Sequence, residues 1–401
     1  MANQTNSNVP EIRLRGFSGE WEEKPIGKIL SETKRPIVLV DNQRYELVTV
    51  KRRNGGVVSR GHLWGREILV KNYSQLQTGD FLISKRQVVH GATGIVPAEL
   101  NKAIVSNEYL VAVGNNEITT EFLTILASLP DMRKKFFLSS YGVDIEKLFF
   151  DVGDWKKRSI TIPMPPEQTQ IVGYFQELDS LIGLHQSKHD KLVTLKKTML
   201  QTMFPQVGAT IPEIRFKGFS GAWEERKLDE VGEFNPKETL PEIFEYVDLE
   251  SVVGTEMVNH RTETRKTAPS RAQRLARQGD LFFQTVRPYQ KNNYLFTQAF
   301  GNYVFSTGYA QIRPFDDGSF LLGLMQRDQF VKVVLDHCTG TSYPAINSNV
   351  LAEILVSVPT PEEQQKIGTY FRTLDELISQ HAIQLNKLQQ IKSACLEKMF
   401  V

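Results

Sequence analysis

The sequence predicts an α+β protein in which two mainly β domains are separated by two long antiparallel helices, with the pseudo-two-fold symmetry of an internal repeat. Two repeated segments and one change of periodicity support this fold class. Residues 10–23 (PEIRLRGFSGEWEE) return at 212–225 as PEIRFKGFSGAWEE, and residues 163–186 (PMPPEQTQIVGYFQELDSLIGLHQ) return at 359–382 as PTPEEQQKIGTYFRTLDELISQHA. The segments between the repeats share little sequence. We therefore expect one duplicated frame that holds two dissimilar inserts.

The composition is that of an ordinary globular protein, with 401 residues, of which 40% are hydrophobic and 23% charged. This length predicts two or three domains, each with its own core. The polar N-terminus and the absence of a long apolar run predict neither a signal peptide nor a membrane anchor. With only Cys338 and Cys395, no disulfide framework is expected, which fits a protein of the reducing cytoplasm. The net charge of +2 is uninformative, so any basic surface must come from local clustering.

Two long helices are predicted where the repeats change to helical periodicity. Pro165 suits the first turn of one helix, and Thr360 with Glu363 forms a capping box at the start of the other. Apolar side chains then recur at steps of three and four, which is the seam of a coiled coil. The predicted seam residues are Phe175, Leu178, Ile182, His185, His189, Leu192, Lys196, Met199 and Met203 in the first helix, and Phe371, Leu374, Ile378, His381, Leu385, Leu388, Lys392, Cys395 and Met399 in the second.

The predicted parts are a first domain at 1–161, a helix at 162–206, a second domain at 207–357 and a second helix at 358–401. Each seam needs a partner, and antiparallel pairing of the two helices would bury both seams in a coiled-coil bar. The alternative is two tandem domains whose helices pack on their own inserts. A helix from 166 to 203 would be roughly 57 Å long, however, and would extend beyond a domain of ordinary radius.

Both inserts, at 30–160 and 232–355, are predicted to be mainly β. In each, a Gly-Asp turn, at Gly79 and at Gly279, precedes a short apolar strand that ends in a basic, amide-rich loop. A second strand that could pair with the first follows. The predicted strands are 45–50, 81–83 and 109–113 in the first insert, and 281–283 and 303–305 in the second. One topology with different loop residues is what two recognition modules for different targets would show.

Basic and amide side chains cluster near these loops. Lys and Arg contact phosphates, while Arg, Gln and Asn can make bidentate contacts with guanine or adenine. The alternative is a solvated charged surface, but nucleic acid explains the clusters better as groups. The candidate DNA-binding residues are Lys51, Arg52, Arg53, Arg60, Lys85, Arg86 and Gln87 in the first insert, and Arg265, Lys266, Arg271, Arg274, Gln284, Thr285, Arg287, Lys291, Asn292 and Asn293 in the second.

The sequence carries almost no signature of an enzyme. It has no phosphate-binding loop, no Gly-rich dinucleotide turn, and no Asn-Pro-Pro-aromatic tetrapeptide of the kind that amino-methyltransferases use. His185 and His189 have the spacing of a metal pair. Their counterparts in the second copy are His381 and Leu385, with no acidic or Cys cluster nearby, so polar seam residues are favoured. We expect no catalytic residue and no metal site, although scattered Asp, Glu and Lys residues leave a nuclease site open.

Several longer motifs occur at the end of the second insert. Thr339-Gly340-Thr341-Ser342-Tyr343-Pro344-Ala345-Ile346-Asn347 is followed by the Pro-Thr-Pro-Glu-Glu run at 359–363, and Gly-Phe-Ser-Gly-x-Trp-Glu-Glu occurs at Gly16 and Gly218. With Gly279-Asp280-Leu281-Phe282-Phe283 and Val286-Arg287-Pro288-Tyr289, these motifs resemble the specificity subunit of type I restriction–modification systems over essentially the whole chain. The first half departs from the pattern, because Leu138-Ser139-Ser140-Tyr141-Gly142 stands where the second half has its Thr-Gly-Thr-Ser-Tyr-Pro run.

The resemblance implies that each insert is a target-recognition domain that binds one half of a split double-stranded DNA site, and that the helices set the spacer. It also implies a pair of modification subunits that supply S-adenosylmethionine and methylate adenine, and restriction subunits that use ATP and Mg²⁺ as motor and nuclease. This chain would bind none of these cofactors itself. The alternatives are a free-standing DNA methyltransferase or nuclease with duplicated recognition domains, and a coiled-coil scaffold that binds only proteins.

Overall fold

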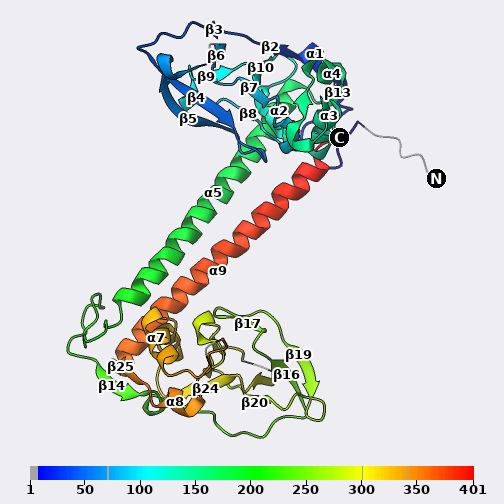
Figure 1. Cartoon of the computed structure of the whole chain (residues 1–401). Helices are drawn as coiled ribbons and strands as arrows, with labels where there is room; N and C mark the ends of the chain where they lie inside the picture. The colour runs from blue at the N-terminus through cyan, green and yellow to red at the C-terminus, as the bar shows by residue number, and fades with distance from the viewer. Residues whose placement is uncertain (1–7, 70–71, 300, 341) are drawn as a thin grey trace. The chain divides into compact units, whose positions relative to one another are not determined.

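The computed structural model describes residues 8–69, 72–299, 301–340 and 342–401 (Figure 1). It contains two compact units. Unit 1 consists of Met1–Leu184 with Asn386–Val401, and unit 2 consists of His185–Leu385. The polar residues 1–7 and Thr341 of the Thr-Gly-Thr run, both used in the sequence analysis, lie outside the described residues. The predicted α+β class is confirmed, because both units combine helices with sheets.

The two long helices are α5 (Pro165–Thr202) and α9 (Pro361–Lys398). In unit 1 the first part of α5 lies beside the last part of α9, where Tyr174 Oη is 3.5 Å from Cys395 Sγ and Lys392 forms an ion pair with Asp179. Residue numbers rise along one helix as they fall along the other. The predicted antiparallel pairing is therefore confirmed in this unit.

Unit 2 contains the rest of both helices, and they are again antiparallel. His185 Nδ1 lies 2.9 Å from His381 Nδ1, and Lys196 forms an ion pair with Asp375. The two histidines occupy the same position of the repeat, as do the two lysines Lys196 and Lys392. Each unit thus uses equivalent residues of the repeat to pair its helix segments.

The predicted seam residues lie on the side of each helix that faces the protein. Those that are buried are Phe175, Leu178, Met203, Phe371, Leu374, Leu385, Cys395 and Met399. Those that are half-buried are Ile182, His185, His189, Leu192, Lys196, Met199, Ile378, His381, Leu388 and Lys392. Of the half-buried positions, Leu388 packs against the core of unit 1, and Leu192 and Met199 pack against the core of unit 2.

Unit 1 has two larger sheets, with the strand orders β2-β10-β7-β8 and β3-β6-β9-β4-β5, and two short ladders, β1-β13 and β11-β12. The strands are β1 (Glu22–Pro25), β2 (Leu30–Glu32), β3 (Pro36–Ile37), β4 (Arg44–Val50), β5 (Val57–Trp64), β6 (Tyr73–Gln75), β7 (Phe81–Ser84), β8 (Thr93–Ile95), β9 (Ile104–Ser106), β10 (Tyr109–Gly114), β11 (Ser140–Tyr141), β12 (Phe149–Phe150) and β13 (Ser159–Ile162).

Unit 2 has the strand orders β15-β24-β21-β22 and β19-β16-β23-β20, and the short ladders β14-β25 and β17-β18. The strands are β14 (Glu224–Lys227), β15 (Gly232–Phe234), β16 (Ile243–Val247), β17 (Val252–Val253), β18 (Glu256–Met257), β19 (Arg261–Thr264), β20 (Ala272–Leu275), β21 (Leu281–Gln284), β22 (Tyr294–Leu295), β23 (Tyr303–Ser306), β24 (Tyr309–Pro314) and β25 (Leu355–Val358).

The two inserts have the same topology despite their dissimilar sequences. The order β2-β10-β7-β8 corresponds strand for strand to β15-β24-β21-β22, and β6-β9-β4-β5 corresponds to β20-β23-β16-β19. The resemblance extends to strand direction, because β4 pairs with β9 in parallel and β16 pairs with β23 in parallel. The strand that follows each Gly-Asp turn, β7 or β21, pairs antiparallel with β10 or β24, as the sequence predicted.

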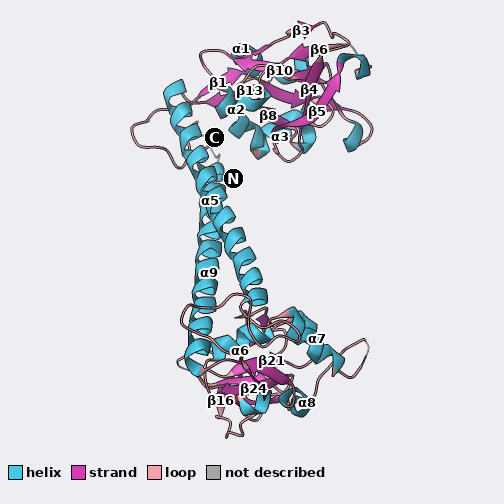
Figure 2. Cartoon of the chain, turned by 90° about the vertical axis from the view of Figure 1, so that its left-hand side faces the viewer, coloured by secondary structure: helices cyan, strands magenta, loops and turns pink. Residues whose placement is uncertain are grey.

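Short helices inside or next to the inserts were not predicted from the sequence. They are α1 (Ile26–Ile29), α2 (Thr120–Ser128), α3 (Pro130–Leu138) and α4 (Val152–Lys157) in unit 1, and α6 (Gly318–Met325), α7 (Asp328–Asp336) and α8 (Ser348–Ala352) in unit 2. Figure 2 shows α6 beside β21 and β24. There Phe320 of α6 is buried in the same core as Leu281 and Ile312. These helices cover one face of each sheet that carries the Gly-Asp turn.

The repeated segments at 10–23 and 212–225 hold the start of each long helix. Arg13 donates two hydrogen bonds, of 2.8 and 2.7 Å, to the buried carboxylate of Glu167, and Arg215 donates two of 2.7 Å to Glu363. The capping box expected of Glu363 is therefore corrected: both of its oxygens accept from Arg215. A bidentate arginine satisfies a buried carboxylate better than a single backbone N–H does.

Candidate nucleic-acid interface

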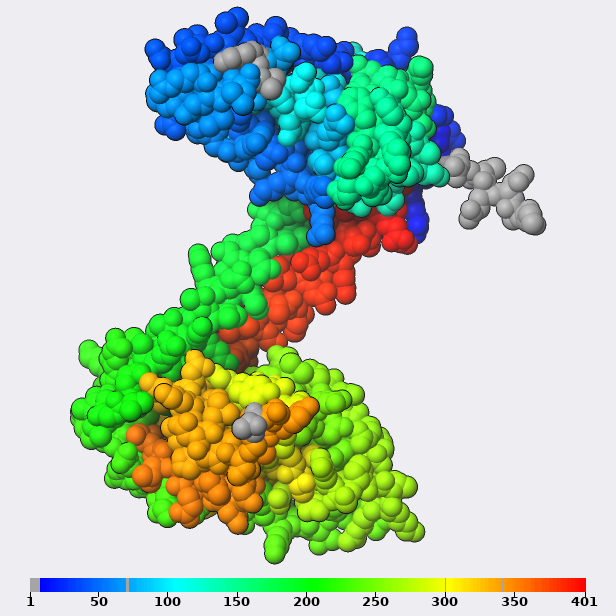
Figure 3. All heavy atoms as spheres, in the orientation of Figure 1, coloured from blue at the N-terminus to red at the C-terminus, as the bar shows by residue number. Residues whose placement is uncertain are grey.

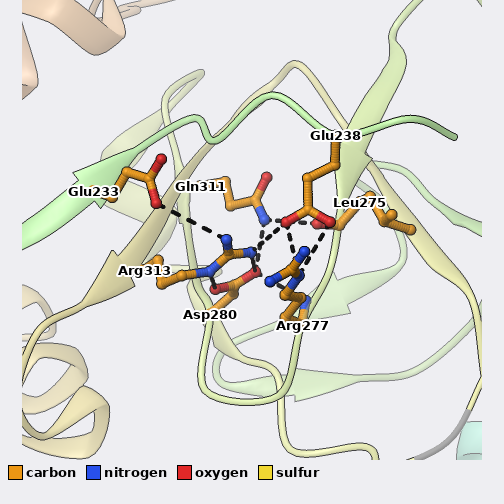
Figure 4. A network of polar contacts seen from close by, with 7 residues as sticks. All are labelled: Glu233, Glu238, Leu275, Arg277, Asp280, Gln311 and Arg313. Atoms are coloured by element: carbon orange, nitrogen blue, oxygen red, sulfur yellow. Dashed lines mark hydrogen bonds and ion pairs between the residues drawn. The ribbon is translucent and has the colours of Figure 1, made fainter.

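A network of ion pairs fixes the start of β21, the strand that leads into the predicted site of unit 2 (Figure 4). The buried Asp280 carboxylate accepts hydrogen bonds from Arg313 at 2.8 and 3.0 Å and from Gln311 at 2.7 Å. This hydrogen bonding raises the pKa of the Arg313 guanidinium. The Glu238 carboxylate lies between Arg313 and Arg277. The network joins β21 to β24, so the loop after β21 starts from a rigid base.

Unit 1 fixes β7 in the same way, with an arginine from a different place in the chain. The buried Asp80 carboxylate accepts from Arg35 at 2.6 and 3.0 Å, and one of its oxygens also accepts from the backbone N–H of Gln77. In unit 2 the equivalent backbone bond runs from Arg277 N to Asp280. The Asp of each Gly-Asp turn is therefore a structural anchor.

The loop after β21 is held together by the side chains that were predicted to bind DNA. Gln284 and Asn293 are only 2% and 1% exposed, and Asn293 Oδ1 accepts from the backbone N–H of Gln284. Thr285 is also buried, and its hydroxyl donates to the Gly308 carbonyl. Gln284, Thr285 and Asn293 are thus buried and bonded within the domain, where they shape the loop, and their contact with DNA stays a prediction.

Two further members of this loop are half-buried and already have partners. Asn292 Oδ1 accepts from the backbone N–H of Gly254 at 2.8 Å, and Lys291 forms an ion pair with Asp328 at 2.5 Å. This pairing lowers the pKa of Asp328. The ion pair neutralises Lys291, so this lysine adds little positive charge to the loop.

Arg287 is different. Its guanidinium lies 4.5 Å from the centre of the Tyr343 ring, and within the described ranges it has no hydrogen bond or ion pair to another side chain. Among the described residues, no acidic side chain of the domain forms an ion pair with Arg287. Arg287 is the cation that this loop presents.

The basic residues of β19 and β20 fall into three groups. Arg261 and Arg265 pair with acids, at 2.7 Å with Asp248 and 3.8 Å with Glu242. Arg274 is half-buried, its Nε has no hydrogen-bond partner, and desolvation lowers its pKa. Lys266 and Arg271 are exposed, and their side chains have no partner among the described residues. The expected cluster is thus reduced to two cations that are available for phosphate.

Unit 1 shows a similar division. Arg52 bonds to Gln87 and Glu146, Arg86 bonds to Glu108, and Lys85 donates to the Asn107 carbonyl. Of the cations predicted in the first insert, Lys51, Arg53 and Arg60 are exposed and have no side-chain partner among the described residues. All three lie on or beside the hairpin of β4 and β5, which is on the outside of unit 1 and is blue in Figure 3.

Aromatic residues lie next to some of the cations, and they were not predicted from the sequence as part of the site. Trp64, at the end of β5, has Arg44 and Arg66 at 5.7 and 5.6 Å from its ring centre. In unit 2, Tyr289 and Tyr343 are exposed near Arg287 in the fold. An aromatic residue next to a basic cluster in the sequence could have indicated this part of the site, because base stacking and cation–π contacts favour the combination.

The described residues contain no group of three or more His, Cys, Asp or Glu side chains that could hold a metal ion. His189 contacts Asp190 beside it, while His185 faces His381. In the same part of the chain, no helix is long and apolar enough to cross a membrane.

Comparison with protein families adds to this geometry. Residues 221–392 match the family model described as the type I restriction modification DNA specificity domain. This stretch of the chain carries the type I specificity domain. The match begins just before β14 and ends at residue 392, near the end of α9, and the repeated segments occur in unit 1 as well.

Individual relatives agree with this family. The type I restriction enzyme MjaVIII specificity subunit of Methanocaldococcus jannaschii is 22% identical over 96% of this chain and 93% of its own length. The HindI specificity subunit of Haemophilus influenzae is 26% identical over 39% of this chain and 35% of its own. The crystal structure of a type I system S subunit from M. genitalium covers 98% of this chain and 99% of its own, at 14% identity with a TM-score of 0.52, and shows a shared fold.

Proposed function

We propose that the chain is the sequence-specific DNA-binding subunit of a type I restriction–modification complex, and that each unit binds one half of a bipartite site. One observation carries this proposal. The two units repeat a single topology, yet the loop after the matched strand is Lys85-Arg86-Gln87 in one and Thr285-Val286-Arg287 in the other. A duplicated scaffold with unlike loops suits recognition of two different sequences.

The paired helices would act as the spacer between the half-sites and as the docking surface for a pair of modification subunits. Support comes from apolar side chains that the seam leaves exposed: Leu181 and Leu184 in unit 1, and Leu195, Leu377 and Ile383 in unit 2. Exposed leucine and isoleucine on a long helix are typical of protein interfaces.

Catalysis would belong to the partners. Modification subunits would bind S-adenosylmethionine and methylate adenine, and restriction subunits would use ATP and Mg²⁺ for translocation and cleavage. This chain would direct both reactions without a catalytic residue or cofactor of its own. Incubation of the purified chain alone with DNA and labelled S-adenosylmethionine distinguishes a specificity subunit from a free-standing methyltransferase. Transfer of label to the DNA without a second protein would establish the methyltransferase instead.

The main test is methylome sequencing of cells with and without this gene, in the presence of its modification subunits. The expected result is one bipartite methylated motif that disappears with the gene. Replacing 232–355 with the insert of a relative should then change one half of the motif and keep the other. Loss of both halves in a folded chimera would contradict independent recognition. Steep salt dependence of binding to the matching duplex would exclude a scaffold that binds only proteins.

A further inference from the structure

The loop after β21 leaves a single cation unoccupied. Its other polar members, Gln284, Lys291, Asn292 and Asn293, bond to the protein, whereas the Arg287 guanidinium contacts only an aromatic ring among the described residues. Arginine is the residue that most often makes specific contacts to guanine, through two parallel N–H donors. The question is what holds this side chain in place, because a free arginine would lose its rotamer entropy on binding.

The backbone of Arg287 is fixed in an uncommon conformation. Its φ and ψ are both 55°, in the left-handed region that residues with a Cβ rarely occupy. The neighbouring chain enforces this, since Arg287 N donates to the Pro344 carbonyl at 2.8 Å and Val286 forms a bridge with Ala345. Strain of this kind is kept where surrounding contacts determine it, and it concentrates at functional sites.

The side chain is fixed by Tyr343, from the same segment. The ring of Tyr343 is 64% exposed, which is unusual for a large aromatic residue, and its face carries the guanidinium at 4.5 Å. Stacking occupies one face of the guanidinium and leaves its N–H groups, which point outward in its plane, free to donate. Backbone and side chain of Arg287 are thus both set by one segment, 343–345, that lies 56 residues further along the chain.

We propose that Tyr343 is a positioning residue for DNA recognition: its ring holds the Arg287 guanidinium ready for a base edge, most simply the O6 and N7 of a guanine. The proposal rests on the proposed DNA-binding function and deepens it. Tyr343 acts through Arg287 and needs no DNA contact of its own. The segment 343–345 near the end of the insert is then part of the recognition surface.

Unit 1 provides a physical contrast. Arg86 lies 4.9 Å from the ring centre of Phe149, but its Nε also donates to Glu108 at 3.2 Å. A carboxylate both neutralises that arginine and holds it in place. In unit 2 no acid does so among the described residues, so the aromatic ring alone orients the cation.

The experiment uses the full chain assembled with its modification subunits, and duplexes that carry the methylome-defined motif or a single changed base pair in the half-site of unit 2. Discrimination is the ratio of the two dissociation constants from fluorescence anisotropy. Tyr343→Leu, which keeps bulk but removes the π face, should lower discrimination by about 3- to 30-fold at one base pair. Tyr343→Phe should retain wild-type discrimination. Because Tyr343 is exposed, both variants should melt at the wild-type temperature.

The double variant Arg287→Ala/Tyr343→Leu decides whether Tyr343 acts through Arg287. If it does, the double variant discriminates no worse than Arg287→Ala alone. A double variant that is clearly worse would overturn the positioning role, since Tyr343 would then contact DNA itself. Wild-type discrimination in Tyr343→Leu would also overturn it. Absence of any discrimination by the wild-type complex would instead refute the proposed function.

Discussion

Replacing Arg215 with leucine should destabilise unit 2 strongly, because it leaves a buried carboxylate without its partner. Glu363 is 0% exposed and receives two hydrogen bonds of 2.7 Å from Arg215. Removing one partner of a buried ion pair costs about 3–5 kcal/mol. Glu363 lies in the first turn of α9, where the helix dipole recovers about 0.3–1 kcal/mol. The expected loss is therefore about 3 kcal/mol.

Calorimetry of the whole chain measures this loss as a shift of the unfolding transition of unit 2. For a unit of this size, 1 kcal/mol corresponds to about 2–4 °C, so Arg215→Leu should lower the Tm by about 6–12 °C. The matched control is Arg226→Leu, because Arg226 pairs with Glu224 at the surface, with side-chain exposures of 48% and 70%. That change should leave the Tm close to the wild-type value, because exposed ion pairs contribute little to stability.

The double variant Arg215→Leu/Glu363→Leu separates the unpaired charge from lost packing. Without a carboxylate to leave unpaired, the double variant should recover most of the stability that Arg215→Leu loses. A double variant as unstable as the single one, or an Arg215→Leu protein that melts within 1 or 2 °C of wild type (about 0.5 kcal/mol), would refute the reasoning.

Three further predictions concern the helices and the core. Inserting four residues between Leu192 and Leu200, about 6 Å of helix, should lengthen the spacer of the methylated motif with unchanged half-sites; unchanged spacing in a folded variant would show that the helices are not a ruler. Desolvation, followed by the nearby charge of His185, lowers the pKa of His381 from 6.5. The unfolded chain therefore binds more protons than the folded chain as pH falls through 6.5, and the free energy of unfolding should drop. His381→Leu should flatten the pH dependence of that free energy in urea unfolding, and the same dependence on pH in both proteins would contradict this. Phe204→Ala, at a fully buried site stacked on α6, should cost about 3–5 kcal/mol in urea unfolding, and a cost below about 1 kcal/mol would argue that the cavity collapses.

Local sequence patterns predicted the parts of the fold that depend on local periodicity. The seam is an example, since steps of three and four placed Phe175 and Leu374 on the buried face of their helices. The strand after each Gly-Asp turn is another, because a short apolar run with a turn before it has few alternatives. Helices α2 and α3 were missed because each has only nine residues and lies in an insert that was interpreted as mainly β.

The site was less predictable, because its properties depend on contacts between distant residues. Gln284 and Asn293 have the chemistry of base-contacting residues, yet they bond to the loop itself, nine residues apart. Arg287 and Arg261 look equivalent in the sequence, but Asp248 neutralises Arg261 and a tyrosine ring faces Arg287. Whether an arginine is available to a ligand is decided by such partners, and a single sequence does not specify them.

The anchors of the Gly-Asp turns bear on how new specificities arise. In unit 2 Asp280 and its partner Arg313 both lie inside the insert, and in unit 1 so do Asp80 and Arg35. The ion pair between Arg215 and Glu363, by contrast, joins two repeat residues of the frame. Other ion pairs cross the border between insert and frame: Lys24 with Glu117, Lys227 with Glu353, and Arg372 with Asp317. An insert transplanted by recombination therefore carries the counter-ion of its own Gly-Asp turn with it, but it also needs a recipient frame that supplies a cation at each crossing pair.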